Sequence, residues 1–572
     1  MSKWMLKAKR ADFKAIAQKF KIDQVTARLI RNRDVIGDEA VNKYLNGTLD
    51  DLYSPHLLKD ADIAAEMIID SIAAAKKIRV VGDYDIDGVV SSYILFRGFK
   101  RIGADVSVRI PDRIRDGYGL NERLVKEAID DGCEVLVTCD NGISAFSQVE
   151  MAKAAGMRVI VTDHHEIPYE NINGERHWLL PPADAVVNPH QENCGYPFKD
   201  ICGAVVAWKL ISVLYEKAGI DRHEALDMIE YAAFATIGDV MDLIDENRII
   251  VKEGLKAMRH TKSAALRKLA LKAGINIEDI SSFHIGFVLG PCINACGRLK
   301  NAERALEFLL CEDESKAESL AEELTELNSR RKDMTEAGVN EAVALIESTD
   351  IGNDKVLAVF LPDCHESIAG IIAGRLRERY GKPVFVFTKS EQGIKGSGRS
   401  IDEYSMYDEL TKVKELMTKF GGHPLAAGLS LADDSVEPFR KRINEVCTLT
   451  DEQLEQKVSL DMQLPLYYVN EELIREFDRL QPFGKGNEAP VFAEKDLTVI
   501  RPSIIGKNRN AVKMTLKSSD GRFMEGIYFG DPAGFMEGFE NGGKLMIAYY
   551  PSINEFRGSR TIQAVIKDFM FV

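Results

Sequence analysis

Acidic and histidine residues stand directly after three short apolar runs of this chain. The runs KIRVV, CEVLVTC and RVIVT are followed in turn by Asp83, Asp85 and Asp87, by Asp140, and by Asp163, His164 and His165. Continuous apolar runs that alternate with helical periods are typical of a parallel sheet buried on both faces. Because the carboxyl ends of parallel strands line one edge of such a sheet, we expect these side chains to meet there.

A divalent metal site is the chemistry that this combination indicates. So many carboxylates within a few ångströms could not all stay ionised without a cation. Carboxylate oxygens with one or two imidazole nitrogens suit Mn²⁺ or Mg²⁺, whereas zinc more often recruits sulfur. Two such ions about 4 Å apart activate a water and stabilise the attacking and leaving oxygens in phosphodiester hydrolysis. The alternative for any single aspartate is a cap on the next helix, so the metal hypothesis depends on the whole set.

The surrounding elements predict an α/β fold with a second α/β lobe and a β-barrel. Strands are expected at 77–85, 133–142, 158–165 and 184–189, and helices from about 203 to 272. The charged stretch 312–332 has little apolar content and predicts a long solvated helix that joins two lobes. After Leu480 the chain lacks helical periodicity and offers many short strands, which favours a small barrel of the oligonucleotide-binding (OB) type.

We divide the 572 residues into five segments, in line with a usual domain size of about 150 residues. These are an N-terminal helical segment (1–50), a catalytic domain with a helical extension (51–310), a linker helix (311–350), a substrate-binding α/β domain (351–450) and a nucleic-acid-binding barrel (456–572).

Composition excludes several classes of protein. The chain is 45% hydrophobic and 28% charged, which is ordinary for a globular protein and excludes a mainly disordered one. No apolar run approaches the roughly 18 residues of a membrane span, and the start has no signal-peptide pattern. Nine cysteines without a CxxC pair predict a reduced, cytoplasmic protein. The net charge of −15 disfavours adhesion to polyanions over the whole surface but permits a local basic groove.

The motifs together resemble a known family. VTDHHE is similar to the signature of the DHH phosphoesterase superfamily, and GDYDIDG, TCDNGIS and IGDVMDL look like its first, second and fourth motifs. GPCINACGRL, HESIAGIIAGRL, GSGRS and FGGHPLAAG resemble the linker and DHH-associated domain of the RecJ family, bacterial single-strand-specific 5′→3′ exonucleases. LQPFGKGNEAPVF resembles the start of that family's barrel, so the likeness runs from about residue 50 to 572.

This resemblance implies roles for the acidic residues and histidines. The metal ligands it implies are Asp85, Asp87, Asp140, His164 and Asp239, with Asp140 as the bridge between two ions. Asp83 and Asp163 would orient these ligands from behind. His165 is a candidate for contacting the scissile phosphate or assisting the leaving group, and is counted with the ligands as catalytic.

It also implies a phosphate-binding loop at 396–400, where small residues let backbone N–H groups approach the phosphate. The alternative is an ordinary turn with one surface arginine. The substrate-binding candidates are Arg113, Asn294, Arg298, Ser397, Arg399 and His423. Two positions depart from the family pattern, because Cys292 stands where Arg is usual and Cys296 where a small residue is usual. The loss of that Arg puts one phosphate contact in doubt, while the predicted metal ligands are intact.

The barrel carries its own signal for nucleic acid. Between Arg501 and Phe529 stand six basic residues against two acidic ones, with Phe523, Tyr528 and Phe529 interleaved. Basic side chains follow phosphates, and aromatic faces stack on unpaired bases. Lys507, Arg509 and Lys513 are the predicted DNA contacts. The alternative is a solvated hairpin whose aromatic residues belong to the core.

The functional hypothesis is a two-metal, single-stranded-DNA-specific 5′→3′ exonuclease of DNA repair and recombination. Its expected partner is single-stranded DNA, with a helicase or a single-strand-binding protein as further candidates and no membrane. Two alternatives stay open: a phosphodiesterase for short oligonucleotides or cyclic dinucleotides, and a non-catalytic DNA-binding scaffold. Intact Asp85, Asp87, Asp140, His164 and Asp239 count against the scaffold.

Overall fold

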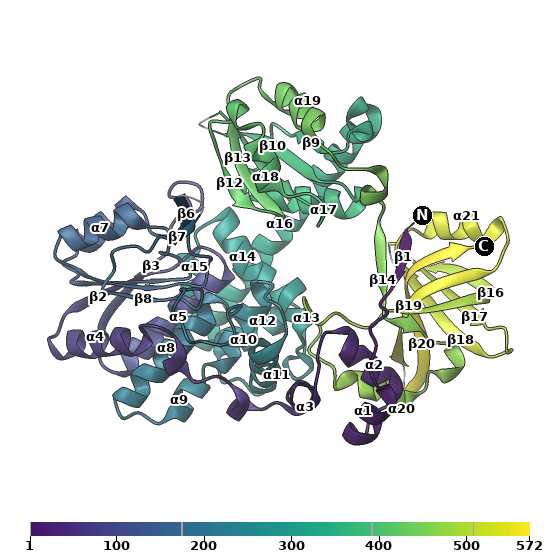
Figure 1. Cartoon of the computed structure of the whole chain (residues 1–572), viewed down its shortest axis with the longest axis horizontal. Helices are drawn as coiled ribbons and strands as arrows, with labels where there is room; N and C mark the ends of the chain where they lie inside the picture. The colour runs from purple at the N-terminus through teal and green to yellow at the C-terminus, as the bar shows by residue number, and fades with distance from the viewer. Residues whose placement is uncertain (1, 173–174, 391–392, 507, 557) are drawn as a thin grey trace. The chain divides into compact units, whose positions relative to one another are not determined.

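The computed structural model divides the chain into two units, each described here by itself (Figure 1). It describes residues 2–172, 175–390, 393–506, 508–556 and 558–572. The first unit combines residues 1–51, 242–248 and 455–572, and the second combines 52–241 and 249–454.

The second unit contains a five-stranded parallel sheet in the order β3-β2-β4-β5-β8. Its strands are β2 (Lys77–Val81), β3 (Asp105–Arg109), β4 (Val135–Cys139), β5 (Arg158–Thr162) and β8 (Ala185–Val187). All five residues of β4 are buried, because helices cover both faces of the sheet. The predicted parallel sheet is therefore confirmed, and three of its strands, β2, β4 and β5, end at the acidic motifs.

Helices complete this lobe, which we call the DHH lobe after the motif it carries. They are α4 (Ala61–Ala73), α5 (Ile86–Arg101), α6 (Glu122–Asp130), α7 (Phe146–Ala154), α8 (Gly203–Lys217), α9 (Arg222–Leu226), α10 (Ile229–Gly238), α11 (Asp245–Met258), α12 (Ala264–Lys272), α13 (Ser282–His284), the π-helical η4 (Ile285–Leu289), α14 (Gly290–Leu299) and α15 (Glu303–Leu309). The packing of α5 against α8 is tight, because a Cβ at Gly98 would lie 2.3 Å from Ile211 Cδ1. A separate two-stranded hairpin is formed by β6 (Tyr169–Ile172) and β7 (Glu175–Trp178).

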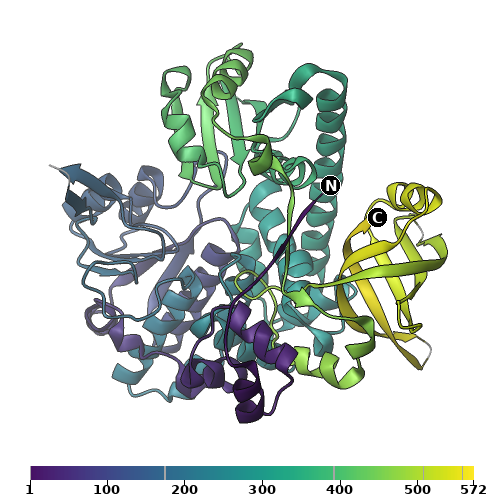
Figure 2. The same cartoon turned by 45° about the vertical axis from the view of Figure 1, so that its right-hand side comes forward.

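The linker helix is α16 (Glu314–Ser348), the long upright helix of Figure 2. Its length matches the prediction, but its solvated character does not. Ala317, Leu320, Ala321 and Leu324 are buried on one face, and α16 packs against α12 and α14. Small apolar residues at spacings of three and four make a narrow stripe, which the high charge of the stretch conceals in a composition count.

The second lobe of this unit, the substrate lobe, has a mixed sheet in the order β12-β13-β11-β10-β9. Its elements are β9 (Leu357–Phe360), α17 (Glu366–Tyr380), β10 (Val384–Ser390), β11 (Gly393–Arg399), α18 (Met406–Thr411), β12 (Lys419–His423), β13 (Ala426–Leu431) and α19 (Val436–Val446).

The predicted phosphate loop is instead most of strand β11, so that prediction is wrong in its local structure. Gly396 and Gly398 face the core, where a Cβ would lie 2.5 Å from a Phe387 ring carbon and from Met406 Sδ respectively. The small residues therefore make room for side chains that pack across the sheet. Ser397 and Arg399 alternate with them and lie on the opposite face.

The first unit is a six-stranded barrel joined to the N-terminal helices. Its elements are β1 (Lys3–Leu6), α1 (Phe13–Phe20), α2 (Gln24–Asn32), α3 (Asp38–Asn46), β14 (Lys457–Leu460), β15 (Met462–Gln463), α20 (Glu471–Asp478), β16 (Phe492–Ile505), β17 (Ala511–Lys517), β18 (Phe523–Phe529), α21 (Pro532–Glu540), β19 (Leu545–Phe556) and β20 (Ser559–Phe571). Pairing of β16 with β19 closes the barrel, and β1 pairs with β14. One apolar core holds residues of both segments, among them Leu29 and Phe477.

Helix α21 was not expected after Leu480. It spans only nine residues, is capped by Asp531 and buries Phe535, so its periodicity is too short to see in the sequence. Across the part of the chain that the structure describes, no helix is both long enough and apolar enough to cross a membrane.

Candidate active site

The carboxyl ends of β2, β4 and β5 bring the acidic motifs together. Ligand atoms that lie within 4.8 Å of one another form three overlapping groups: Asp83, Asp85 and Asp140; Asp87, His164 and Asp239; and Asp140, His164 and His165. We call Asp83, Asp85, Asp87, Asp140, His164 and Asp239 the carboxylate edge. Asp239 reaches it from the end of α10, which shows how a residue of the fourth motif joins strand-end residues.

The imidazole of His164 lies at the centre of this edge. Its Nε2 is 3.1 Å from Asp140 Oδ1, 3.6 Å from Asp87 Oδ2 and 3.8 Å from Asp239 Oδ2. Oxygen and nitrogen atoms from four strands and helices thus converge on a space of atomic size. An ion that bound there would take ligands from three motifs at once.

Asp87 is held by the N-terminus of α8. The backbone N–H of Gly203 donates to Asp87 Oδ2 over 2.6 Å, and that of Ala204 donates to Oδ1 over 2.8 Å. A Cβ at Gly203 would lie 2.7 Å from Asp140 Cβ, so only glycine allows the two motifs to approach this closely. The positive end of α8 stabilises negative charge on Asp87.

Asp85 and Asn294 fix the loop that leads into α5. Asp85 Oδ1 accepts hydrogen bonds from the backbone N–H groups of Asp87 and Gly88, so Asp85 caps α5, which was the alternative to metal binding. Its carboxylate also belongs to one of the three groups of possible metal ligands. Asn294 Oδ1 accepts from the Ile86 N–H over 2.9 Å. Asn294, predicted as a substrate contact, thus positions the first motif in this structure.

Asp140 has a left-handed backbone conformation, which aspartate adopts more readily than most residues other than glycine. Its φ of 61° lies in the left-handed region, and its carbonyl oxygen accepts a hydrogen bond of 2.7 Å from the Tyr118 hydroxyl. Strain of this kind is retained at sites where the surrounding structure determines one side-chain direction. Tyr118 was not found from the sequence, because a lone tyrosine in an irregular loop carries no signal.

The raised pKa values of the carboxyl groups at this edge indicate that the edge favours a bound cation. Burial raises the pKa of Asp83, Asp87 and Asp140, and neighbouring carboxylates add to this at each of them. Asp83 Oδ2 is buried without a hydrogen-bond partner among the described residues, and the buried Asp140 Oδ1 lies 3.1 Å from His164 Nε2. Buried carboxylate oxygens with so few donors, in a set of hard oxygen and imidazole ligands, fit Mn²⁺ or Mg²⁺.

Behind the edge, Asp163 holds His165. Asp163 Oδ1 is 2.8 Å from His165 Nδ1 and accepts from the His164 N–H, while Oδ2 accepts from the Ile143 N–H. Burial would raise the pKa of Asp163, but the charge and hydrogen bond of His165 outweigh it and lower the pKa to about 2. Burial likewise opposes the His165 cation, yet Asp163 raises its pKa to about 9.

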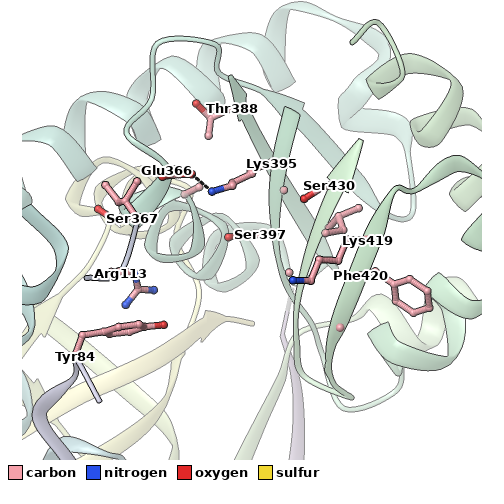
Figure 3. A pocket seen from close by; sticks show the side chains of 16 residues that line it. Tyr84, Arg113, Glu366, Ser367, Thr388, Lys395, Ser397, Lys419, Phe420 and Ser430 are labelled. Atoms are coloured by element: carbon pink, nitrogen blue, oxygen red, sulfur yellow. Dashed lines mark ion pairs between the residues drawn. The ribbon is translucent and has the colours of Figure 1, made fainter. Parts of the chain in front are cut away.

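A pocket of about 380 Å³ lies in the same unit, between the DHH lobe and the substrate lobe (Figure 3). Tyr84 and Arg113 line it from one lobe, and Ser367, Ser397 and Lys419 line it from the other. Figure 3 shows Arg113 beside the Tyr84 ring, where its guanidinium carbon is 4.6 Å from the ring centroid. Hydroxyl and cationic groups from both lobes therefore face one space.

Three arginines act electrostatically on a fourth, Arg298, near this pocket. We call Arg113, Arg298, Arg331 and Arg399 the arginine cluster. Burial and the other three guanidinium groups lower the pKa of Arg298 to about 9, and its Nη1 donates to the Ser367 carbonyl over 2.6 Å. Among the described residues, no ion pair joins Arg113, Arg298 or Arg399 to a carboxylate. Clustered cations without counter-charges indicate an anion site.

Arg331 was missed because it lies in the charged stretch of α16. Its Nε donates to Asn328 Oδ1, and Asn328 Nδ2 is 3.4 Å from Cys292 Sγ. Arg331 is therefore linked through Asn328 to Cys292, the position where the family pattern expects Arg. His423, by contrast, is exposed at the end of β12 and is not among the residues that line the pocket.

On the barrel, the alternation of exposed and buried positions along β17 and β18 shows which predicted residues face the solvent. Lys513 and Lys517 point outward from β17, and Phe523 and Phe529, which are 62% and 61% exposed, point outward from β18. Tyr528 instead packs against Phe535 and Phe569.

Of the three predicted DNA contacts, Arg509 has a left-handed backbone in the β16–β17 turn and Lys513 forms an ion pair with Glu525. Lys507 lies outside the described residues. Tyr467, 51% exposed beside Arg522, was missed.

Comparisons with known proteins agree with this organisation. Family models described as "DHH family, N-terminal domain", "DHHA1 domain" and "RecJ OB domain" match residues 77–238, 353–449 and 460–568. The single-stranded-DNA-specific exonuclease RecJ of Bacillus subtilis is 33% identical over 97% of this chain and 69% of its own. The Haemophilus influenzae protein of the same name is 33% identical over 92% and 93%.

Solved structures give the same result. The crystal structure of RecJ from Thermus thermophilus in complex with Mn²⁺ matches 99% of this chain and 79% of its own, with a TM-score of 0.84 at 27% identity. The Mg²⁺ complex of the same protein has a TM-score of 0.78 at 26% identity. The predicted fold class, two α/β lobes joined by a long helix with a terminal OB barrel, is confirmed.

Proposed function

This chain belongs to the RecJ family, and from that premise we propose that it is a metal-dependent exonuclease that removes nucleotides from the 5′ end of single-stranded DNA. The observation that carries the proposal is the presence of two clusters of opposite sign in one unit. The carboxylate edge has a buried oxygen without a donor, at Asp83, and among the described residues Arg113, Arg298 and Arg399 form no ion pair with a carboxylate. A phosphodiester with divalent ions supplies what each cluster lacks.

Under this proposal, the residues that would hold the metal ions are Asp85, Asp87, Asp140, His164 and Asp239, and Asp140 is the predicted bridge. When bound, a pair of Mn²⁺ or Mg²⁺ ions activates a water and stabilises the charge that develops on the reacting phosphate. The α8 N-terminus, Asn294 and the Tyr118 hydroxyl orient these ligands through Asp87, the Ile86 N–H and the Asp140 carbonyl. Asp83, which is also part of the carboxylate edge, is proposed to orient the neighbouring ligands, and its own Oδ1 is fixed by accepting a hydrogen bond from the Gly119 N–H.

His165 is proposed to assist departure of the leaving oxygen. With a pKa of about 9 its ring carries two protons at neutral pH. Asp163 fixes the Nδ1 side, and the Nε2 proton is then directed away from Asp163. A proton held at Nε2 can be donated to the oxygen that leaves with the shortened strand or the released nucleotide.

The arginine cluster is proposed to bind the terminal phosphate. Planar guanidinium groups bind phosphate oxygens in pairs, and Ser397 on β11 offers a hydroxyl to the same space. A site for a terminal phosphate selects strand ends, and this is what makes the cleavage exonucleolytic. The outward face of β17 and β18 would hold the strand further from its end, through Lys513, Lys517, Phe523 and Phe529.

The alternatives are not favoured. A phosphodiesterase for short oligonucleotides or cyclic dinucleotides has no use for a barrel with an outward basic and aromatic face, whereas a polymer does. A non-catalytic scaffold would not need the complete ligand set. We further propose that the protein acts in the cytoplasm, and we keep a helicase or a single-strand-binding protein as predicted partners.

The test is digestion of single-stranded DNA labelled at either end, with duplex DNA and RNA as controls. With Mn²⁺, we expect 5′-labelled strands to release labelled mononucleotide at once, and 3′-labelled strands to shorten progressively. Duplex ends and RNA should be degraded far more slowly. Binding of strands without degradation under any divalent ion would overturn the proposal in favour of the scaffold.

A further inference from the structure

The β6–β7 hairpin directly follows the histidine pair and has no place in the proposed mechanism. It pairs Tyr169 with Trp178 and Ile172 with Glu175, and forms a two-stranded sheet of its own. In Figure 1 it stands apart from the five-stranded sheet. All eight strand residues are exposed, and a two-stranded hairpin is marginally stable by itself.

The two faces of the hairpin differ in chemistry. Paired residues share a face and alternate along each strand, so Tyr169, Asn171, Arg176 and Trp178 form one face and Glu170, Ile172, Glu175 and His177 the other. Both glutamates therefore lie on the second face. The first face carries two large rings, an amide and one guanidinium, and no carboxylate.

The two rings of the first face lie edge to face and remain partly exposed to solvent. The Tyr169 and Trp178 ring centroids are 5.4 Å apart at 70°, and the Arg176 guanidinium carbon lies 4.7 Å from the Tyr169 centroid. Tyr169 remains 44% exposed and Trp178 37% exposed. A cross-strand aromatic pair would stabilise the hairpin by itself, but a guanidinium beside exposed rings also suits a base and its phosphate.

The root of the hairpin ties this face to the carboxylate edge. Ile167 is buried in the core, the Leu179 N–H donates to the Pro168 carbonyl over 2.8 Å, and the His165 carbonyl accepts from Asn188 Nδ2. Tyr169 is four positions after His165, so their Cα atoms are at most about 14 Å apart. A fully stacked strand, with a rise of about 3.4 Å per nucleotide, spans this distance with about four nucleotides, and a more extended single strand spans it with fewer.

We propose that the Tyr169–Trp178 face of this hairpin, which we call the hairpin face, stacks on unpaired bases of the substrate a few nucleotides from the scissile phosphate. The inference rests on the proposed function and names a specificity element of that same site. Duplex bases are stacked on one another and offer no free ring face, so this contact selects single strands.

The first test measures binding of a long 5′-phosphorylated DNA strand in EDTA, where hydrolysis is suppressed. We expect Tyr169→Ala/Trp178→Ala to weaken binding about 5- to 150-fold, which is the effect of losing about 1–3 kcal/mol of base stacking. The matched control, Ile172→Ala/His177→Ala on the opposite face, should bind like the wild type. Equal affinities of the two double variants would overturn the inference.

The second test uses Trp178 as a reporter. Of the three tryptophans, Trp208 is only 3% exposed, so strand-induced quenching that is lost in Trp178→Phe would report the hairpin face. A normal strand should quench this fluorescence, and a strand with abasic sites near its 5′ end should not. Equal quenching by both strands, or none by either, would overturn base stacking.

These results separate the hairpin from the proposed function. If the wild type degrades single strands and both double variants do so equally well, the hairpin inference falls and the exonuclease stands. If strands quench Trp178 but no divalent ion supports degradation, the exonuclease falls and the hairpin contact stands. Unchanged thermal unfolding of the Tyr169→Ala/Trp178→Ala variant would show that its binding loss is not a folding defect.

Discussion

The carboxylate edge and the arginine cluster are opposite in charge, and both are shielded from solvent, with three buried carboxylates in the first and four half-buried arginines in the second. At the edge, burial and mutual repulsion raise the pKa of Asp83, Asp87 and Asp140. In the cluster, burial and mutual repulsion lower the pKa of Arg298 and Arg399. Each arrangement is unfavourable by itself. Two clusters of like charges in one unit are explained if the ligand carries both positive and negative charge, as a phosphate with a divalent metal ion does.

The difference between them lies in what each selects. Under the proposed function, the carboxylates and the imidazole would select a cation and so set the rate of hydrolysis. The guanidinium groups, spread over two lobes, would select an anion with several oxygens and so set which end of the strand is bound. Damage to the edge should therefore abolish catalysis, and damage to the cluster should change preference.

The largest expected effect is at Asp140. Asp140→Asn keeps the left-handed backbone, which Asn tolerates, but removes the charge between the two proposed ions. We expect Mn²⁺-dependent release of nucleotides to fall by about 10³-fold or more, because several kcal/mol of transition-state stabilisation are lost.

The control for this change is Asp105→Asn. Asp105 is exposed at the start of β3, at the opposite edge of the same sheet. It should keep full activity. Comparable losses in the two variants would mean that the sheet, and not the carboxylate edge, is what activity depends on.

The next effect is a change in end preference. Arg399→Gln and Arg298→Gln should lower the ratio of kcat/KM for 5′-phosphorylated over 5′-hydroxyl strands by about 10- to 100-fold, because a charge-assisted hydrogen bond contributes about 1.5–3 kcal/mol. Arg379→Gln, exposed near the end of α17, is the control and should leave the ratio unchanged. An unchanged ratio in all three variants would remove the arginine cluster from phosphate recognition.

A smaller effect is expected on the barrel, which extends the comparison to a site without buried charge. Phe523→Ala should weaken binding of long strands about 5-fold and leave short oligonucleotides unaffected, since one stacked base contributes about 1 kcal/mol. Tyr528→Ala removes a ring that packs in the core, so it should lower the melting temperature first. Binding assays over a series of strand lengths, beside thermal unfolding, would show whether the two aromatics differ in this way.

The smallest effect is stabilisation of the folded protein by a bound ligand. It tests whether each cluster binds an ion of opposite charge, and it needs no activity assay. Ligands that bind only the folded state raise its stability. Mn²⁺ should raise the melting temperature of the wild type by a few degrees and that of Asp140→Asn by less. Inorganic phosphate should raise the melting temperature of the wild type by about 2 °C and that of Arg298→Gln by less. Equal shifts in wild type and variant would contradict the assignment of that ligand to that cluster.

Much of this organisation was open to sequence reasoning. The parallel sheet, the meeting of three strand ends and the barrel were predicted from apolar runs and the turns between them, and the linker helix from a charged stretch. Errors occurred where a local pattern has two meanings. Gly396 and Gly398 suggested a phosphate loop, but they make room for Phe387 and Met406 within a strand. The charge of α16 concealed its buried stripe.

Other features had no sequence signal at all. The backbone N–H groups of Gly203 and Ala204 hold Asp87 from more than a hundred residues away, and Asn294 serves the Ile86 N–H. Arg331 and Tyr118 enter the site from a charged helix and an irregular loop. The N-terminal helices share a core with the barrel at the other end of the chain.

The sequence by itself determined which residues end the apolar strands, because hydrophobic periodicity and strand direction are local properties. It therefore predicted that aspartates and histidines share one edge. Tertiary structure alone decided which donors satisfy each carboxylate, which oxygens are left for a cation, and which arginines face one another. Those outcomes depend on distances between segments that are remote in the chain, and no local pattern encodes such distances.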